Sequence, residues 1–60
     1  MKLLTITEVA DLLRTSPNTI NYWVYMGKGP RSMKIGRRRL WPEAEVLAWL
    51  DTQSVSQHQG

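Results

Sequence analysis

The stretch from Ser16 to Gly27 constrains the fold of this chain most, because it carries both a start and a stop signal for one helix. Ser16 is a favourable N-cap, Pro17 suits the first helical position, and Gly27 suits the left-handed residue just past the end. Between these signals, apolar and polar residues separate onto opposite sides at helical spacing. The side expected to point inward holds Ile20, Trp23, Val24 and Gly27. The side expected to point outward holds Asn18, Asn21, Tyr22 and Tyr25.

The outward side of this helix carries amides and phenols but no charge. Such a stripe suits contacts with base edges and phosphates, so it predicts a DNA-recognition helix. The residues expected to contact DNA from this helix are Ser16, Pro17, Asn18, Thr19, Asn21, Tyr22 and Tyr25. Plainer interpretations stay open: the amides are solvated, the tyrosines pack on a neighbouring loop, and Thr19 bonds back within its own helical turn.

The cations of the chain are concentrated in one segment. Six of the eight lysines and arginines lie between residues 28 and 39, where there is no acid, and the rest of the chain sums to −3 within a net charge of +3. A basic segment on a mildly acidic body indicates contact with a polyanion, the alternative being a solvated basic loop. The residues expected to contact DNA from this segment are Lys28, Arg31, Lys34, Gly36, Arg37, Arg38 and Arg39.

An earlier helix is predicted over roughly residues 6–14. Thr5 and Glu8 match the capping box, and an apolar stripe follows at helical spacing. Pro17 disfavours helical geometry at Ser16, so this helix should end before the next one begins. Two short helices joined by such a turn predict a helix-turn-helix. Plain helix packing is the alternative, and the exposed polar stripe argues against it.

Residues 31–41 predict a β-hairpin with Gly36 near its middle. Two registers stay open. A two-residue turn sets Lys34 opposite Arg39, a like-charge pair that is unfavourable unless an anion lies nearby. A four-residue loop instead leaves all three consecutive arginines at the tip. Either register gives a basic ribbon beside the recognition helix, which is the form of a wing.

A third helix is predicted to open at Pro42, with a buried stripe of Val46, Leu47 and Leu50 and with Trp49 at its edge. Residues 1–52 should form one domain, and residues 53–60 a disordered tail. Trp41 either packs under the wing or faces a second copy. The predicted core consists of Ile6, Val9, Leu13, Ile20, Trp23, Val24, Ile35, Leu40, Val46, Leu47 and Leu50.

Composition excludes several classes of function. The chain has no cysteine, so it forms no disulfide and no thiolate zinc site, which fits a reducing cytoplasm. The only histidine, His58, lies in the predicted tail without a second ligand, so neither a metal nor another cofactor is expected. The carboxylates lie on separate helices without a pocket, which argues against an enzyme. No apolar run approaches a membrane span and no signal-peptide pattern follows Met1.

The order of these motifs resembles a known family. The residues that carry the resemblance are Leu4–Leu13, Ser16–Ile20, Gly27, Pro30, Lys34–Gly36, the arginines after it and Leu47–Leu50. They resemble the excisionase/AlpA group of small winged helix-turn-helix proteins, which are related to the DNA-binding domain of MerR regulators. The resemblance implies an α+β, mostly helical fold of three short helices and a two-stranded wing.

The resemblance also implies a role. It points to an excisionase that binds repeated sites on double-stranded DNA in the bacterial or phage-infected cytoplasm, bends the DNA and directs an integrase toward excision. Head-to-tail contacts between copies are part of that expectation. A small transcriptional regulator is the alternative, and a protein-interaction module without DNA binding is the alternative from a different class. One departure stands out, since Asn21 and Tyr22 occupy positions where such helices often carry Arg or Lys. This departure favours adenine contacts over guanine contacts.

Overall fold

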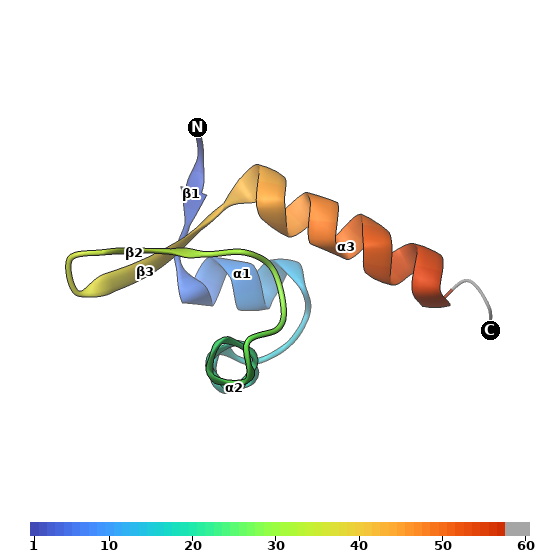
Figure 1. The fold of residues 1–60 in the computed structure, drawn as a ribbon, viewed down its shortest axis with the longest axis horizontal. Coiled ribbons are helices and arrows are strands. Elements are labelled where there is room, and N and C mark those ends of the chain that lie inside the picture. Colours follow the sequence, from blue (N-terminus) through green and yellow to red (C-terminus); the bar gives the residue numbers. More distant parts are fainter. Residues whose placement is uncertain (58–60) are drawn as a thin grey trace.

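The structure is a computed structural model that describes the backbone of residues 1–57 and the side chains of residues 1–53. The elements follow the order β1 (Leu3–Leu4), α1 (Ile6–Leu12), α2 (Pro17–Met26), β2 (Met33–Ile35), β3 (Arg38–Pro42) and α3 (Glu43–Gln57) (Figure 1). Within residues 1–57, three helices accompany an antiparallel sheet with the strand order β1-β3-β2. The predicted winged helix-turn-helix fold is confirmed.

The sheet has one strand more than the two-stranded wing that the sequence predicted. Leu3 and Leu4 pair with Pro42 and Trp41 as an antiparallel strand on the other side of β3. The backbone N–H of Glu43 also donates to the carbonyl of Lys2 at 2.9 Å. This short strand ties the start of the chain to the junction between β3 and α3, so β3 becomes the central strand of the sheet.

The start of α1 follows the prediction and its end does not. The side chain of Thr5 accepts from the backbone of Glu8 at 3.2 Å, and the side chain of Glu8 accepts from the backbone of Thr5 at 2.8 Å. The helix stops at Leu12 rather than at Arg14, because Arg14 adopts a left-handed φ of 56°. A left-handed residue turns the chain out of the helix and toward α2.

The core differs from the predicted one and includes Trp41. The buried side chains that form the core cluster are Leu4, Val9, Ala10, Ile20, Trp41 and Val46. The partly buried side chains packed around them are Ile6, Leu13, Trp23 and Val24. Trp41, whose place the sequence left open, is buried in this core with 1% of its surface exposed.

Four predicted core residues lie outside this core. Ile35 is 49% exposed, Leu47 48% and Leu50 39%, and Leu40 is only half-buried. Ile35 and Leu40 belong to the hairpin, which projects beyond the helices (Figure 1). No second layer of structure in the described part of the chain covers the outer face of that ribbon.

The third helix begins later and ends later than predicted. Pro42 is the last residue of β3, paired with Leu3, and does not open the helix. The helix extends from Glu43 to Gln57 and projects away from the rest of the molecule (Figure 1). The expected boundary near residue 52 therefore falls inside α3, and the last part of the expected tail, residues 58–60, lies outside the described residues. Over residues 1–57, the helices lack the length and apolar character needed to cross a bilayer.

Candidate nucleic-acid interface

Both ends of α2, the second helix of the helix-turn-helix, are defined by capping residues. Ser16 caps it, its side chain accepting from the backbone of Thr19 at 3.2 Å, and Pro17 occupies the first turn. Gly27 ends it in the left-handed conformation with φ 75°. The helix therefore begins and ends where its sequence signals predicted.

The outward face of α2 is exposed as predicted. Asn18 and Asn21 are exposed, Tyr22 is 55% exposed and Tyr25 is 86% exposed. Tyr25 is almost fully open to solvent, whereas the ring of Tyr22 lies next to Lys28 of the loop that follows α2. Thr19 is only half-buried and its hydroxyl lies 3.1 Å from that of Ser16, so both hydroxyls take part in the cap.

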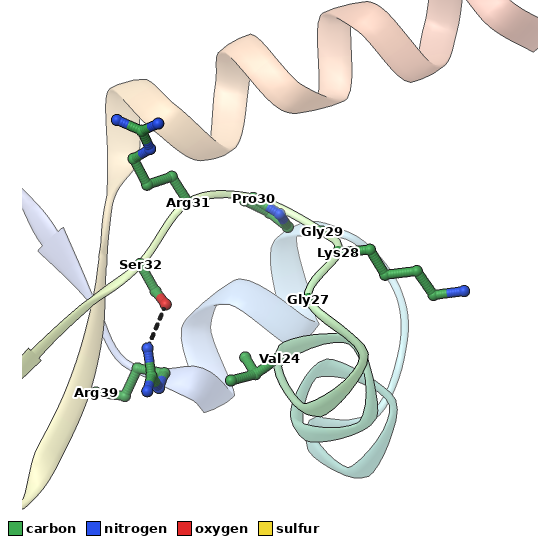
Figure 2. A pocket seen from close by; sticks show the side chains of 8 residues that line it. All are labelled: Val24, Gly27, Lys28, Gly29, Pro30, Arg31, Ser32 and Arg39. Carbon is green, nitrogen blue, oxygen red and sulfur yellow. Dashed lines mark hydrogen bonds between the residues drawn. The ribbon is translucent and has the colours of Figure 1, made fainter.

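Trp23 and Val24, on the two sides of the inward face of α2, lie near different elements. Trp23 contacts Trp49 of α3, with ring centroids 5.3 Å apart at an interplanar angle of 43°. Val24 instead lines a cavity together with Arg39 of β3 (Figure 2). Asn21 lies about 60° round the helix from Val24, on its solvent side, because each residue advances by about 100°. The amide of Asn21 therefore lies on the edge of the outward face that is nearer to the wing.

The wing uses the two-residue turn. Met33 pairs with Leu40, Lys34 with Arg39 and Ile35 with Arg38, which leaves Gly36 and Arg37 as the turn residues. Gly36 has φ 63° and Arg37 has no positive φ. Glycine at the first central position with this conformation is typical of a type II′ hairpin turn, which matches the twist of the strands. The four-residue loop, which the sequence left open, is therefore excluded.

This register divides the arginines of the wing between two faces. Side chains directly opposite each other point to the same face, and successive side chains alternate. Arg39 shares its face with Trp41, which points into the core toward α1 and α2. Arg38 and Ile35 point to the other face, and Arg37 lies at the turn. The three consecutive arginines are therefore not one cluster at a tip.

A cavity of about 300 Å³ lies between the end of α2 and the base of the wing (Figure 2). Its wall includes three exposed cations, Lys28, Arg31 and Arg39. Arg39 extends toward Ser32 and donates from Nη1 to its Oγ at 2.8 Å, whereas Arg31 extends to the opposite side of the loop (Figure 2). Lys28 extends away from Arg39, and its Nζ lies 5.8 Å from the ring centroid of Tyr22.

Comparison with protein families matches residues 3–54 to the helix-turn-helix domain. The match includes α1, the turn, α2 and the wing, and it spans most of the chain. The chain belongs to this family. Searches among curated proteins and among solved structures gave no significant match.

Membership of the helix-turn-helix domain family indicates that the protein binds double-stranded DNA and does so in a sequence-specific way. Domains of this kind are typically not enzymes. Within the residues that the structure describes, no three His, Cys, Asp or Glu side chains lie close enough together to hold a metal ion. The exposed face of α2 is polar and uncharged, and the wing beside it is basic.

Sequence reasoning missed one residue of this region, Ser32. Lys34 and Arg39 are direct partners in the register, so Ser32, two residues before Lys34, is a diagonal neighbour of Arg39. The sequence implies this proximity of Ser32 and Arg39 only if the hairpin has the two-residue turn. It became visible once the register was known.

Proposed function

We propose that α2 enters the major groove of DNA with its outward face and that the wing contacts the phosphate backbone. The observation that carries this proposal is the exposed, uncharged polar face of α2, whose Asn21 edge lies nearer to a basic ribbon. In this arrangement the amides of α2 select the base pairs. The cations of the wing and of the preceding loop supply the attraction to the duplex, since α2 itself contains no Lys or Arg.

The side chains of α2 indicate the bases that would be selected. An asparagine amide matches the donor and acceptor of adenine in the major groove, whereas guanine is usually contacted by Arg or Lys. Asn18 and Asn21 are exposed on α2, and both phenols beside them can bond phosphates. We therefore expect a target site in which adenines are the main determinants under α2. Ser16, Pro17 and Thr19 then lie at the end of the helix that approaches the backbone.

The proposal is tested by selecting bound duplexes from a randomised pool and measuring the affinity of Asn21→Ala for the selected site. We expect a loss of about 1–3 kcal/mol on that site and little loss on random DNA, because a base contact contributes only where its base is present. Thr7→Ala, an exposed change on α1, is the control and should leave both affinities unchanged. Equal losses of affinity on both duplexes would show that Asn21 contacts the DNA backbone or supports the fold, and does not contact a base.

We further propose that the protein acts as an excisionase. Its motifs resemble those of the excisionase/AlpA group. A single module of this size buries only about 600–1,000 Å² of protein surface when it binds DNA. Useful occupancy would then require several copies on adjacent sites. Head-to-tail contacts between such copies would bend the duplex and present it to an integrase.

A paired assay distinguishes this role from that of a transcriptional regulator. The protein is supplied to cells that carry the neighbouring integrase with its attachment sites, and to cells that carry a promoter reporter from the same locus. Stimulated excision without a change in the reporter supports the excisionase. A changed reporter without excision assigns the protein to transcription regulation instead.

A further inference from the structure

Three polar side chains share one face of the wing, the face turned toward α1 and α2. Lys34 and Arg39 are direct cross-strand partners, and Ser32 lies on the same side as their diagonal neighbour. We refer to Ser32, Lys34 and Arg39 as the helix-side wing face. Arg38 and Ile35 form the next pair and point to the opposite face.

Within this face, the guanidinium of Arg39 is hydrogen-bonded to Ser32. Its Nη1 donates to the Oγ of Ser32 at 2.8 Å, which uses one of the five N–H donors of the guanidinium. The remaining donors stay available beside the cavity, which Val24 and Gly27 line from the side of α2 (Figure 2). A guanidinium that is already oriented loses less side-chain freedom when it binds a ligand.

The electrostatics of this face favour an anion. Lys34 and Arg39 are directly opposite like charges, an arrangement that destabilises a hairpin in the absence of a counter-charge. The cavity that Arg39 lines has two further cations in its wall, Lys28 and Arg31, and no acidic residue. A bound anion would relieve the repulsion between Lys34 and Arg39 and would pair with the free N–H groups of the guanidinium.

We propose that the helix-side wing face binds one phosphate of the DNA backbone, with Arg39 and Lys34 as its ligands and Ser32 as the residue that positions Arg39. This inference rests on the proposed DNA binding and assigns unequal roles to neighbouring arginines. Arg39 grips a phosphate between the wing and α2. Arg38 points to the other face of the wing and does not contact that phosphate.

The first test compares Arg39→Gln with Arg38→Gln, two adjacent substitutions that remove the same charge. The affinity of each variant for one duplex is measured over a range of salt concentrations. We expect Arg39→Gln to reduce the slope of log affinity against log salt by about 0.9, the value for one lost phosphate contact, and Arg38→Gln to leave it unchanged. Equal slopes for the two variants would overturn the inference. Failure of the unsubstituted protein to bind any duplex would instead overturn the proposed function.

The second test concerns Ser32. We expect Ser32→Ala to weaken DNA binding about 2- to 10-fold, the range for one hydrogen bond, without changing the salt slope, and Ser32→Thr to restore affinity because it keeps the hydroxyl. The loss should vanish when Ser32→Ala is combined with Arg39→Gln and persist when it is combined with Arg38→Gln. A loss that persists with Arg39→Gln would make Ser32 a residue of the fold alone and would overturn its positioning role. Thermal unfolding of each variant, followed by circular dichroism, shows whether the fold is kept.

A third measurement distinguishes backbone phosphate from a free anion. Inorganic phosphate is added at constant ionic strength while the side-chain N–H resonances of the arginines are followed by NMR. We expect no saturation at millimolar phosphate, because an isolated ion lacks the other contacts of a docked duplex. Tight binding of phosphate that Arg39→Gln abolishes, together with equal DNA salt slopes for both glutamine variants, would assign the face to a free anion and overturn the inference.

Discussion

At the scale of single residues, the two helices of the helix-turn-helix end in the same way with different residues. After α1, Arg14 N–H donates to Asp11 O at 3.2 Å and Thr15 N–H to Ala10 O at 2.8 Å. After α2, the corresponding donors are Gly27 and Lys28, which bond Val24 O at 3.1 Å and Trp23 O at 2.8 Å. Both patterns are Schellman motifs, which place one residue in the left-handed conformation. Glycine fills that position after α2, and an arginine fills it after α1.

This comparison predicts that Arg14→Gly stabilises the protein. A left-handed conformation costs an L-residue about 1–2 kcal/mol, and the greater freedom of glycine in the unfolded chain offsets part of the gain. We expect the free energy of unfolding to rise by about 0.5–1 kcal/mol, measured by urea denaturation. Arg14→Gln, which removes the charge but keeps the Cβ atom, should give no gain, and Gly27→Ala should lose about 1 kcal/mol. A gain for Arg14→Gln equal to that for Arg14→Gly would assign the effect to charge.

At the scale of elements, α3 shows that an apolar residue in a helix is not always buried. Val46 has no exposed surface, whereas its neighbour Leu47 is 48% exposed. The helix contacts β3 and, through Trp49, the Trp23 ring of α2, so only one side of it is covered. Its apolar stripe is wider than the surface available to bury it, and its far end projects beyond the core (Figure 1).

Alanine substitution should therefore lower the free energy of unfolding more at Val46 than at Leu47, although valine is the smaller side chain. Val46→Ala is expected to lower the free energy of unfolding by about 2 kcal/mol, because it removes methyl groups from a fully buried site. Leu47→Ala removes a larger group but should cost less than about 1 kcal/mol, since half of that side chain already contacts water. Chemical denaturation of both variants measures the difference. A larger loss at Leu47 would show that α3 packs with another face.

At the scale of the whole molecule, most of the cations lie on different elements from the polar face that we propose reads the base sequence. Six of the eight Lys and Arg residues lie in the loop and the wing, and α2 is uncharged. The cavity that Val24 and Arg39 both line joins the two elements at one side of the molecule (Figure 2). A single duplex can therefore be contacted by both, provided that the wing follows the backbone while α2 lies in the groove.

Removing the arginines of the wing tests this division. With Arg37, Arg38 and Arg39 all changed to Ala, the slope of log affinity against log salt should fall by about 0.9 for each arginine that contacts a phosphate. The preference for the selected site over random DNA should stay close to its original ratio, because the proposed base contacts of α2 are not altered. Lys2→Gln, which removes one exposed charge on the side of β1, is the control and should leave the slope unchanged. An unchanged slope in the triple variant would remove the wing from DNA binding.

The sequence by itself determined the features that depend on local interactions. The capping box at Thr5, the cap at Ser16 and the left-handed Gly27 were all predicted, because each depends on residues a few positions apart. The exposed stripe of α2 was predicted for a similar reason, since helical periodicity fixes which side chains share a face. The family resemblance rested on the same ordered motifs, and it led to the winged helix-turn-helix fold.

Only the tertiary structure decided which apolar residues are buried and which cations act together. Burial depends on what packs against a surface, so Trp41 lies in the core, while Ile35, Leu47 and Leu50 remain exposed because the described residues do not cover them. The register of the wing was one of two that the sequence allowed, and a shift between them moves side chains to other positions. That register placed Arg39 beside Ser32 and turned Arg38 away. The number of cations could be counted from the sequence, but the face of the wing to which each arginine points became known only from the strand pairing.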